Sequence, residues 1–287
     1  MELFEEFGAR SGRRLRARRG SARRESYEAD LFFAELTGTA LPQPRTRRPA
    51  QAWSELTEDS AGPPKVVAPA CTCTHTSRKY ANGKVTTADL IGAKATIKAR
   101  YGKVCCEGTT TTSTAYKVAW AGVTKPEGTM VWAQTGFGRE RNSGSATIKN
   151  YRYWEVNGSS YNVFYDVTNP PAEGSAHTYQ CEVNNSTGKW TFVFDGKSWA
   201  THTDAGWKAI TGSRADYTGE IFNEDDDMPG TAADKCTFRD CKKKSTGGAY
   251  VDAGLTTANV GSSDSTQWGA SRISSTSMDI WDKNPLP

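Results

Sequence analysis

The sequence predicts an all-β protein, an antiparallel sandwich or barrel, and three observations support this. Apolar and polar residues alternate with a period of two in several short runs between about residues 80 and 240. Gly, Asn, Pro and Ser bound these runs, as they do at strand ends. No helical period of any length interrupts residues 90–240. Many short strands without helices between them are typical of antiparallel sandwiches and barrels.

Four runs show the alternation most clearly, and each has the β-branched or aromatic content of a strand. Residues 91–100 alternate Ile or Ala with Lys, Thr and Arg. Residues 116–120 place Tyr, Val and Trp on one face. Residues 161–167 alternate in the same way, and residues 190–195 carry three aromatic side chains on one face. The sequence therefore predicts a strand at each of these places.

Turn signals separate the later strands. Asp195-Gly196 and the Ser-Thr-Gly segment at 186–188 predict hairpin turns, because such residues accept the backbone angles that tight turns require. After Lys244 the chain becomes rich in Ser, Thr and Gly. One or two edge strands there, anchored by Trp268, Ile280 and Trp281, and a loosely packed tail are both compatible with this composition.

Residues 1–65 differ from the rest and predict an Arg-rich, Pro-containing extension. The first 64 residues carry 11 Arg and no Lys, and Pro-rich segments follow at 42–49 and 61–64. A disordered tail, a pro-segment or misassigned upstream sequence is favoured over a nucleic-acid contact, because no aromatic or Gly pattern accompanies the charge. We expect residues 66–287 to form the β-sandwich domain, with a Ser/Thr-rich C-terminal part.

Composition excludes some classes of function. The 287 residues are 36% hydrophobic and 24% charged, and the mean hydropathy is −0.65. No stretch approaches the roughly 18 to 20 apolar residues of a membrane helix, so we expect no membrane span. Residues 66–287 hold 24 basic and 22 acidic residues, which leaves the β domain nearly neutral. Binding to nucleic acid is therefore not expected.

The seven cysteines favour disulfides over a metal site. They occur as Cys-Thr-Cys, Cys-Cys and Cys-x4-Cys, with one more between, and these spacings differ from the paired Cys-x2-Cys of zinc ribbons. Cys71 or Cys73 could pair with Cys105 or Cys106, and Cys236 with Cys241 could close a small loop. Disulfides indicate an oxidising compartment.

An acidic run, Glu224-Asp-Asp-Asp227, could hold calcium, but it lacks the alternating spacing of an EF-hand loop. A solvated acidic loop is the favoured interpretation. No phosphate-binding loop, nucleophile elbow or Ser/His/Asp signature occurs, and no cofactor or metal is expected.

Two strand-borne polar residues are candidates for chemistry. Gln134 shares a face with Met130 and Trp132, and Glu220 shares a face with Asp216 on a later strand. A polar residue with aromatic neighbours on a strand face requires a partner or a cleft. A polar lining in a binding domain is the alternative without chemistry.

These segments resemble the eqolisins, secreted glutamic peptidases with a concanavalin A-like β-sandwich. The resemblance rests on Ala119-Trp-Ala-Gly-Val, Gln134-Thr-Gly-Phe and Gly219-Glu-Ile-Phe, with aromatic strands between them. It covers residues 90–245 and implies a concanavalin A-like jelly roll, with Gln134 and Glu220 at the catalytic positions. Trp132 and Tyr153 are then expected to contact substrate. The related neprosin-type peptidases use two Glu residues, so Glu155 or Glu182 could instead partner Glu220.

The resemblance implies a peptide or protein substrate. Glu220 would act as general base on water and return the proton to the leaving amine, while Gln134 would donate to the oxyanion. An acid optimum is expected if Glu220 must begin protonated. The alternative is a non-catalytic, lectin-like module that binds a glycan, because the same architecture hosts both functions. A secreted monomer is expected, although no export signal is recognised in residues 1–65.

Overall fold

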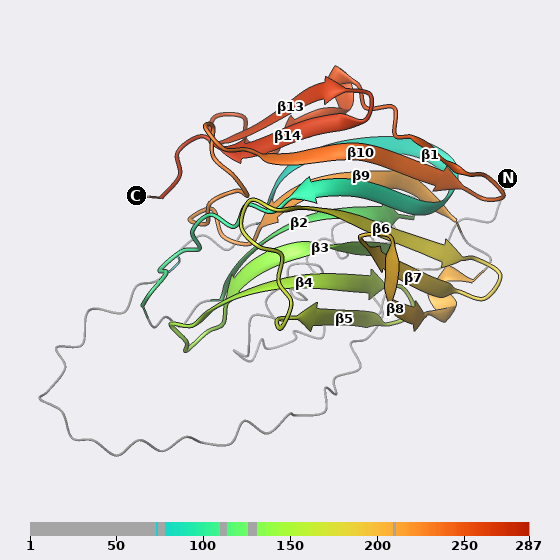
Figure 1. Ribbon diagram of the computed structural model, residues 1–287, viewed down its shortest axis with the longest axis horizontal. Coiled ribbons are helices and arrows are strands. Elements are labelled where there is room, and N and C mark those ends of the chain that lie inside the picture. The colour runs from blue at the N-terminus through green and yellow to red at the C-terminus, as the bar shows by residue number, and fades with distance from the viewer. Residues whose placement is uncertain (1–72, 74–77, 110–113, 126–130, 209–210, 287) are drawn as a thin grey trace, which may run out of the picture.

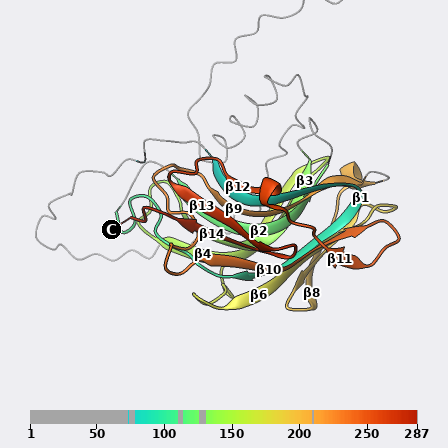
Figure 2. The same ribbon diagram turned by 90° about the horizontal axis from the view of Figure 1, so that it is seen from above.

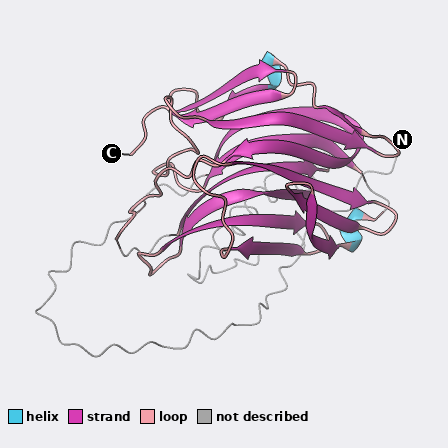
Figure 3. Ribbon diagram, in the orientation of Figure 1, coloured by secondary structure: helices cyan, strands magenta, loops and turns pink. Residues whose placement is uncertain are grey.

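The computed structural model describes Cys73 and residues 78–109, 114–125, 131–208 and 211–286, and this part of the chain is almost entirely β (Figure 3). The extension over residues 1–65 lies outside the described residues. The strands are β1 Lys79–Lys98, β2 Ala115–Thr124, β3 Trp132–Arg141, β4 Ile148–Asn157, β5 Tyr161–Asp166, β6 Ala176–Asn184, β7 Lys189–Phe194, β8 Lys197–Thr203, β9 Gly212–Ile221, β10 Cys236–Ser245, β11 Tyr250–Asp252, β12 Val260–Ser262, β13 Trp268–Ser274 and β14 Ser277–Asp282. Two short 3-10 turns, η1 (Ala205–Trp207) and η2 (Thr257–Asn259), complete the elements.

All strand pairs are antiparallel, which confirms the fold class. The main path runs β13-β14-β10-β1-β9-β2-β3-β4-β5, and Figure 1 shows it descending through the molecule in that order. Strands β6, β7 and β8 branch from β1. Each of the four runs predicted from alternation coincides with a strand, β1, β2, β5 or β7, although three of the runs extend one or two residues beyond the strand end.

Strand β1 belongs to two layers. Its first half pairs with β9 and β12, and its second half pairs with β6 and β10. The change of partner falls at Asp89, where φ is 58° and the register with β9 shifts. The layer that contains β9, β2 and β3 therefore packs against the layer of β6, β7 and β8, and Figure 2 shows the molecule from above.

Small and aromatic side chains fill the space between the layers. Trp190 and Phe192 of β7 are fully buried there, together with Trp207. Ala119 and Ala121 of β2 face them from the opposite layer. Burial of this aromatic surface is the main stabilising contribution to the sandwich.

The hairpin turns form where the sequence predicts them. Asp195 and Gly196 join β7 to β8 with φ values of 49° and 76°, the left-handed conformation that a two-residue hairpin turn requires. Gly188, with φ of 71°, ends the turn between β6 and β7. The C-terminal part forms strands, one of the two alternatives, and not a loosely packed tail. Strands β13 and β14 pair with each other, and Trp268 and Ile280 are buried.

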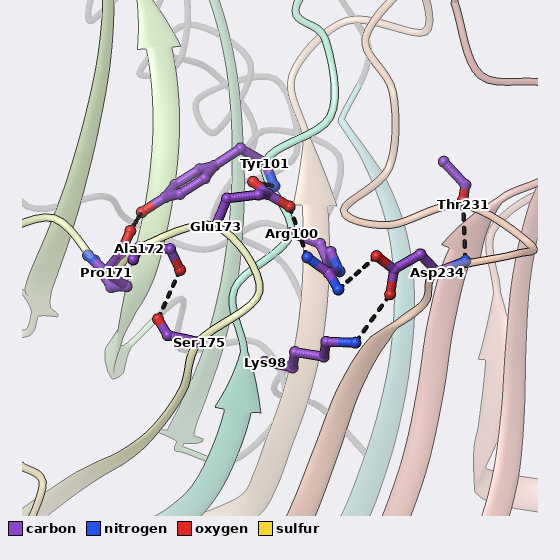
Figure 4. A network of polar contacts seen from close by, with 9 residues as sticks. All are labelled: Lys98, Arg100, Tyr101, Pro171, Ala172, Glu173, Ser175, Thr231 and Asp234. Atoms are coloured by element: carbon purple, nitrogen blue, oxygen red, sulfur yellow. Dashed lines mark hydrogen bonds and ion pairs between the residues drawn. The ribbon is translucent and has the colours of Figure 1, made fainter.

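Polar contacts hold together three segments beyond the second half of β1 (Figure 4). Arg100 forms ion pairs with Glu173 at 3.1 Å and with Asp234 at 2.5 Å. Glu173 also accepts from the backbone N–H of Tyr101 at 3.0 Å, and the Tyr101 hydroxyl donates to the carbonyl oxygen of Pro171 at 2.8 Å. The loop before β6 and the segment before β10 are thereby attached to the end of β1.

The cysteine predictions are partly right. Cys73 and Cys105 form a disulfide, as one of the expected pairings has it. The pairing of Cys236 with Cys241 is wrong, because both thiols are free and buried. The two residues lie on one extended strand, β10, whose backbone keeps them apart. Cys71 lies outside the described residues.

The prediction that residues 224–227 form a solvated acidic loop is wrong for two of the four residues. Asp226 and Asp227 are buried and accept backbone hydrogen bonds rather than facing water or an ion. Asp226 accepts from Cys105 N at 2.6 Å, and Asp227 accepts from Lys103 N at 2.7 Å. These carboxylates therefore attach the segment after β9 to the segment that follows β1.

No helix in the described part of the chain is long and apolar enough to cross a membrane.

Candidate active site on the outer face of the sheet

Gln134 and Glu220 lie on the same face of the sheet, the face that points away from the core. Gln134 belongs to β3 and Glu220 to β9, and β2 runs between these strands. On β2, Ala119 and Ala121 point into the core, so Trp120 must point to the other face. Gln134 pairs with Gly122 and Glu220 with Val118, which lie on the same face as Trp120.

Both side chains lean toward the row of residues between them. Gln134 and Glu220 are four positions apart along β2, at the levels of Gly122 and Val118. The middle row holds Trp120. The same row continues across β3 to Tyr153 on β4. Glu220 contacts Trp120, and Gln134 contacts Tyr153.

Aromatic donors hold the Glu220 carboxylate. The indole Nε1 of Trp120 donates to Oε2 at 3.3 Å, and the hydroxyl of Tyr116 donates to Oε1 at 3.3 Å. Arg78 Nε lies 3.6 Å from Oε1. Glu220 is only 6% exposed. These contacts stabilise an ionised carboxylate at a place that excludes most solvent.

The Gln134 amide, also 6% exposed, faces a phenol and a second carboxylate. Its Nε2 donates to the Tyr153 hydroxyl at 3.1 Å and to Glu155 Oε2 at 3.3 Å. The Tyr153 oxygen accepts this bond, which leaves the hydroxyl proton available as a donor. Burial raises the pKa of Tyr153 well above its usual value, and the nearby Glu155 and Glu220 raise it further. The phenol therefore remains protonated.

Two glycines make room for these side chains. A Cβ atom at Gly138 would lie 2.7 Å from the ring of Tyr151, which packs beside Tyr153. A Cβ atom at Gly122 would lie 3.0 Å from both Gln134 Cβ and the ring of Trp120. The Ala-Gly and Gln-Thr-Gly-Phe-Gly segments thus let large side chains share one face of adjacent strands.

The other candidates are split between this face and the rest of the molecule. Trp132 Nε1 donates to Glu155 Oε1 at 2.9 Å, so Trp132 borders the site through Glu155. Glu155 pairs directly with Gln134. Glu182 lies on β6 in the other layer and forms an ion pair with Lys244 at 2.5 Å. Of the two alternative carboxylates, only Glu155 lies in the cluster.

Sequence reasoning missed Tyr116 and Arg78. The alternation places Tyr116 on the same face as Trp120. Its contact with Glu220, which is 104 residues away in sequence, depends on β9 lying beside β2. Arg78 precedes the first strand and carries no motif. Only the order of the strands brings them together.

Within the described residues, no group of metal-ligating side chains is found at the site. In the described part of the chain, the one group of side chains close enough to share an ion is Cys73, Cys105 and Cys106. Cys73 and Cys105 are joined in a disulfide, and Cys106 is disulfide-bonded as well, so these sulfurs do not offer a thiolate set.

Comparison with solved structures finds glutamic peptidases. A crystal structure of scytalido-glutamic peptidase with a peptide-based transition-state analogue has a TM-score of 0.46 and 14% identity, and covers 71% of this chain and 98% of that one. SCP-B, a member of the eqolisin family, in complex with the tripeptide Ala-Ile-His has a TM-score of 0.42 and 15% identity over the same shares.

A carbohydrate-binding module is also similar. The CBM40 of Ruminococcus gnavus IT-sialidase, bound to α2,3-sialyllactose, has a TM-score of 0.27 and 9% identity, and covers 75% of this chain and 95% of that one. No protein-family model and no curated protein sequence matches the chain. All these TM-scores lie below 0.5. The structure resembles those of the eqolisin peptidases, the family that the motifs around Gln134 and Glu220 indicate.

Proposed function

We propose that the protein is a glutamic-peptidase-like endopeptidase in which Glu220 activates water and Gln134 stabilises the oxyanion. The observation that supports this most strongly is the placement of the pair. Both residues are nearly buried on one sheet face, outside the core, and lean toward a shared row. The core does not require polar groups there, and hydrogen bonds to aromatic side chains hold both groups in place on a face that excludes most solvent. A carboxylate and an amide held in this way meet the requirements of a general base and an oxyanion donor.

The reaction follows from the atoms present. The Glu220 carboxylate takes a proton from a water molecule, whose oxygen attacks the scissile carbonyl carbon. The new C–O bond turns the carbonyl oxygen into an oxyanion, to which Gln134 Nε2 and the Tyr153 hydroxyl donate. Glu220 then transfers its proton to the amide nitrogen, the C–N bond breaks, and the carboxylic acid and amine products leave. The carboxylate is regenerated, so no other reactant is consumed.

The expected contribution of each catalytic group to the rate can be given as an order of magnitude. A general base contributes about 10²- to 10⁴-fold, and one oxyanion donor about 10²- to 10³-fold in kcat. Substituting Glu220 should therefore reduce turnover at least as much as substituting Gln134. Tyr153→Phe removes the hydroxyl alone, and should lower kcat while leaving KM nearly unchanged if the phenol acts on the oxyanion.

The test uses the full chain and a denatured protein substrate from pH 2 to 7, with pepstatin present to suppress aspartic peptidases. Glu220→Gln is expected to lower kcat/KM at least 100-fold. Glu182→Gln is the matched control, because this carboxylate lies in the other layer. Wild-type protein that cleaves nothing at any pH, or a Glu220→Gln variant with full rate, would refute the proposal.

A second pair of variants separates chemistry from packing. Gln134→Ala should lower kcat about 100-fold or more, whereas Gln180→Ala, on β6 of the other layer, should not. Both variants should unfold at similar urea concentrations. Equal losses of activity in the two variants would indicate that Gln134 acts only through the fold.

The compartment and assembly belong to the same proposal. The disulfide between Cys73 and Cys105 is compatible with secretion, because such bonds persist in oxidising environments. We propose a secreted monomer whose β-sandwich domain spans residues 66–287, preceded by the extension over residues 1–65. Size-exclusion chromatography with light scattering tests the assembly.

Glycan binding is the second candidate, and one observation favours it. Phe164 of β5 is 49% exposed, and its ring centroid lies 6.0 Å from that of Trp199. Exposed aromatic rings can stack on sugar rings. A glycan array on the wild type and on Phe164→Ala tests this function: a signal that disappears in the variant, without peptide turnover, would favour a lectin-like protein.

A further inference from the structure

A depression lies beside the candidate site along the first half of β1. Its volume is about 480 Å³, within the range typical of ligand pockets. The lining consists of Tyr80, Asn82, Lys84, Ala258, Asn259, Val260, Gly261, Ser262 and Ser263. One wall is thus β1, and the other is the segment 258–263 that contains β12. We call this depression the β1 groove.

The β1 groove is continuous with the outer face that carries Glu220. Tyr80 lines the groove and pairs directly with Glu220 on β9, so one end of the groove lies next to the candidate catalytic residue. Asn82 pairs with Thr218, one step further along. Lys84 then pairs with a third residue of β9, Asp216. A peptide bound with its scissile bond at Glu220 would extend along these side chains.

The far wall of the β1 groove is attached to β1 by backbone bonds. Strand β12 pairs with residues 81–83. Tyr80 N donates to Ser263 Oγ at 3.0 Å, and Ser263 N donates to the Tyr80 carbonyl oxygen at 2.8 Å. The groove is therefore built from sheet backbone, which gives a binding site more precision than a free loop does.

Two polar groups have no partner within the described residues: Lys84 in the lining of the groove, and Thr218 on the neighbouring strand β9. Thr218 is 1% exposed, and its Oγ1 is buried without a hydrogen bond. Buried hydroxyl groups are normally hydrogen-bonded, and this one keeps an unused donor and acceptor beside the groove. Lys84 forms no hydrogen bond or ion pair with any described residue.

The carboxylate nearest to Lys84 is already engaged. Asp216 Oδ1 lies 2.8 Å from Arg214 Nε, and Oδ2 accepts from Thr124 Oγ1 at 2.8 Å. The pKa of Lys84 is lowered from its usual value by partial burial of the ammonium and by Arg214, although Asp216 raises it. Lys84 and Arg214 together outweigh the one carboxylate, so this end of the groove carries net positive charge.

We propose that the β1 groove binds a substrate segment that bears a carboxylate and that Lys84 selects it. The inference rests on the proposed peptidase function and adds a substrate class, peptides with Glu or Asp, or a free C-terminus, near the scissile bond. Asn82, which lines the groove between Tyr80 and Lys84, binds the peptide backbone on the way. Lys84 is a specificity residue and takes no part in the bond-breaking step.

The experiment compares matched peptides. Fluorogenic peptides carry Glu or Gln at each position around a common cleavable sequence, and a second set has a free or an amidated C-terminus. Wild type is expected to favour the Glu or free-acid member about fivefold in kcat/KM at pH 5, the upper end for a partly exposed ion pair. Lys84→Gln should abolish the preference and Lys84→Glu should reverse it. Lys197→Glu, on β8, is the charge-matched control and should retain the preference.

The outcomes separate this inference from the proposed function. Cleavage without any Glu/Gln or acid/amide difference, or a preference that survives in Lys84→Glu, overturns the groove and leaves the peptidase intact. If the wild type cleaves nothing, fluorescence anisotropy with the same peptides measures binding instead. A preference for the carboxylate peptides that weakens with salt and disappears in Lys84→Gln supports the groove alone. Equal binding of all peptides overturns it.

Discussion

Asp226 is a buried carboxyl whose ionisation we expect to oppose folding. It is 3% exposed, and its oxygens accept from the backbone N–H groups of Cys105 at 2.6 Å and Asn223 at 3.3 Å. Burial raises the pKa of Asp226 to about 6, although these bonds and the cations Lys117 and Arg141 favour the charged form. Asp226→Asn keeps an oxygen that can accept from Cys105 and removes the titration.

The size of the effect follows from linkage. At about 1.4 kcal/mol for each pKa unit, a rise of the pKa from 3.8 to about 6 corresponds to about 3 kcal/mol. Because the folded protein binds this proton more tightly than the unfolded chain, the contribution is fully present below pH 3.8. It is lost as the pH rises through about 6. Burial lowers the pKa of Lys117 to about 8. This lysine therefore stays charged between pH 3.8 and about 6 and does not change how stability depends on pH in that range.

Urea unfolding at pH 3.5, 5 and 7 measures the difference. The free energy of unfolding of the wild type, relative to that of Asp226→Asn, should be about 3 kcal/mol larger at pH 3.5 than at pH 7. Asp225→Asn, a change of the same charge at a half-buried neighbour, is the matched control. A constant difference between wild type and Asp226→Asn would refute the reasoning. A difference that shrinks on acidification would show that Lys117 and Arg141 keep the carboxylate ionised.

Three further predictions concern stability, measured by urea unfolding at pH 6. Gly138→Ala should lower the free energy of unfolding by about 1 to 3 kcal/mol, because the new methyl group would lie 2.7 Å from the Tyr151 ring; no loss would show that the ring can move aside. Replacing Cys73 and Cys105 together by Ser should cost about 3 to 4 kcal/mol, since the bond closes a loop over 32 positions; an unchanged midpoint would contradict this. Asp204→Ala should cost at least about 3 kcal/mol, because the buried carboxylate accepts from three backbone N–H groups; a loss below 1 kcal/mol would show that water replaces it.

The strands could be predicted from sequence because one face of most of them is buried and the other is wet. In β7, Trp190 and Phe192 point inward while Thr191 is half-buried, and this contrast is what a period of two reports. β1 could not be predicted as a single strand of 20 residues, because its break in pairing at Asp89 depends on which strands lie beside it. Alternation records burial along one strand and contains no information about partners.

The wrong predictions have a common physical origin. The run at 224–227 reads as a solvated loop because charged residues are rarely buried. Asp226 and Asp227 are exceptions because the segment after β1 directs backbone N–H groups at them. Cys236 and Cys241 read as a pair because five positions can close a loop, but an extended strand holds them too far apart. Local composition records neither the backbone N–H groups that a distant segment supplies nor the extended conformation of β10.

For the candidate site too, the sequence predicts individual residues but not which strands lie side by side. The motifs identify Gln134 and Glu220, and alternation assigns each to a strand face. Their placement on one face of the sheet requires β2 to lie between β3 and β9, with a register that places Gly122 beside Gln134 and Val118 beside Glu220. Lys84 carries no motif, and its position relative to Glu220 follows only from the pairing of β1 with β9.

The core-facing residues of β2 therefore decide which side chains reach the site. Ala119 and Ala121 are fully buried between the layers, which turns Trp120 to the outer face. A slip of one residue in the pairing of β2 with β9 would exchange the faces and take the indole donor away from Glu220. The fit of two alanines against the opposite layer thus positions the group that holds the candidate base. A bulky residue at either alanine should disturb the site without touching it, because core and site are two faces of one strand.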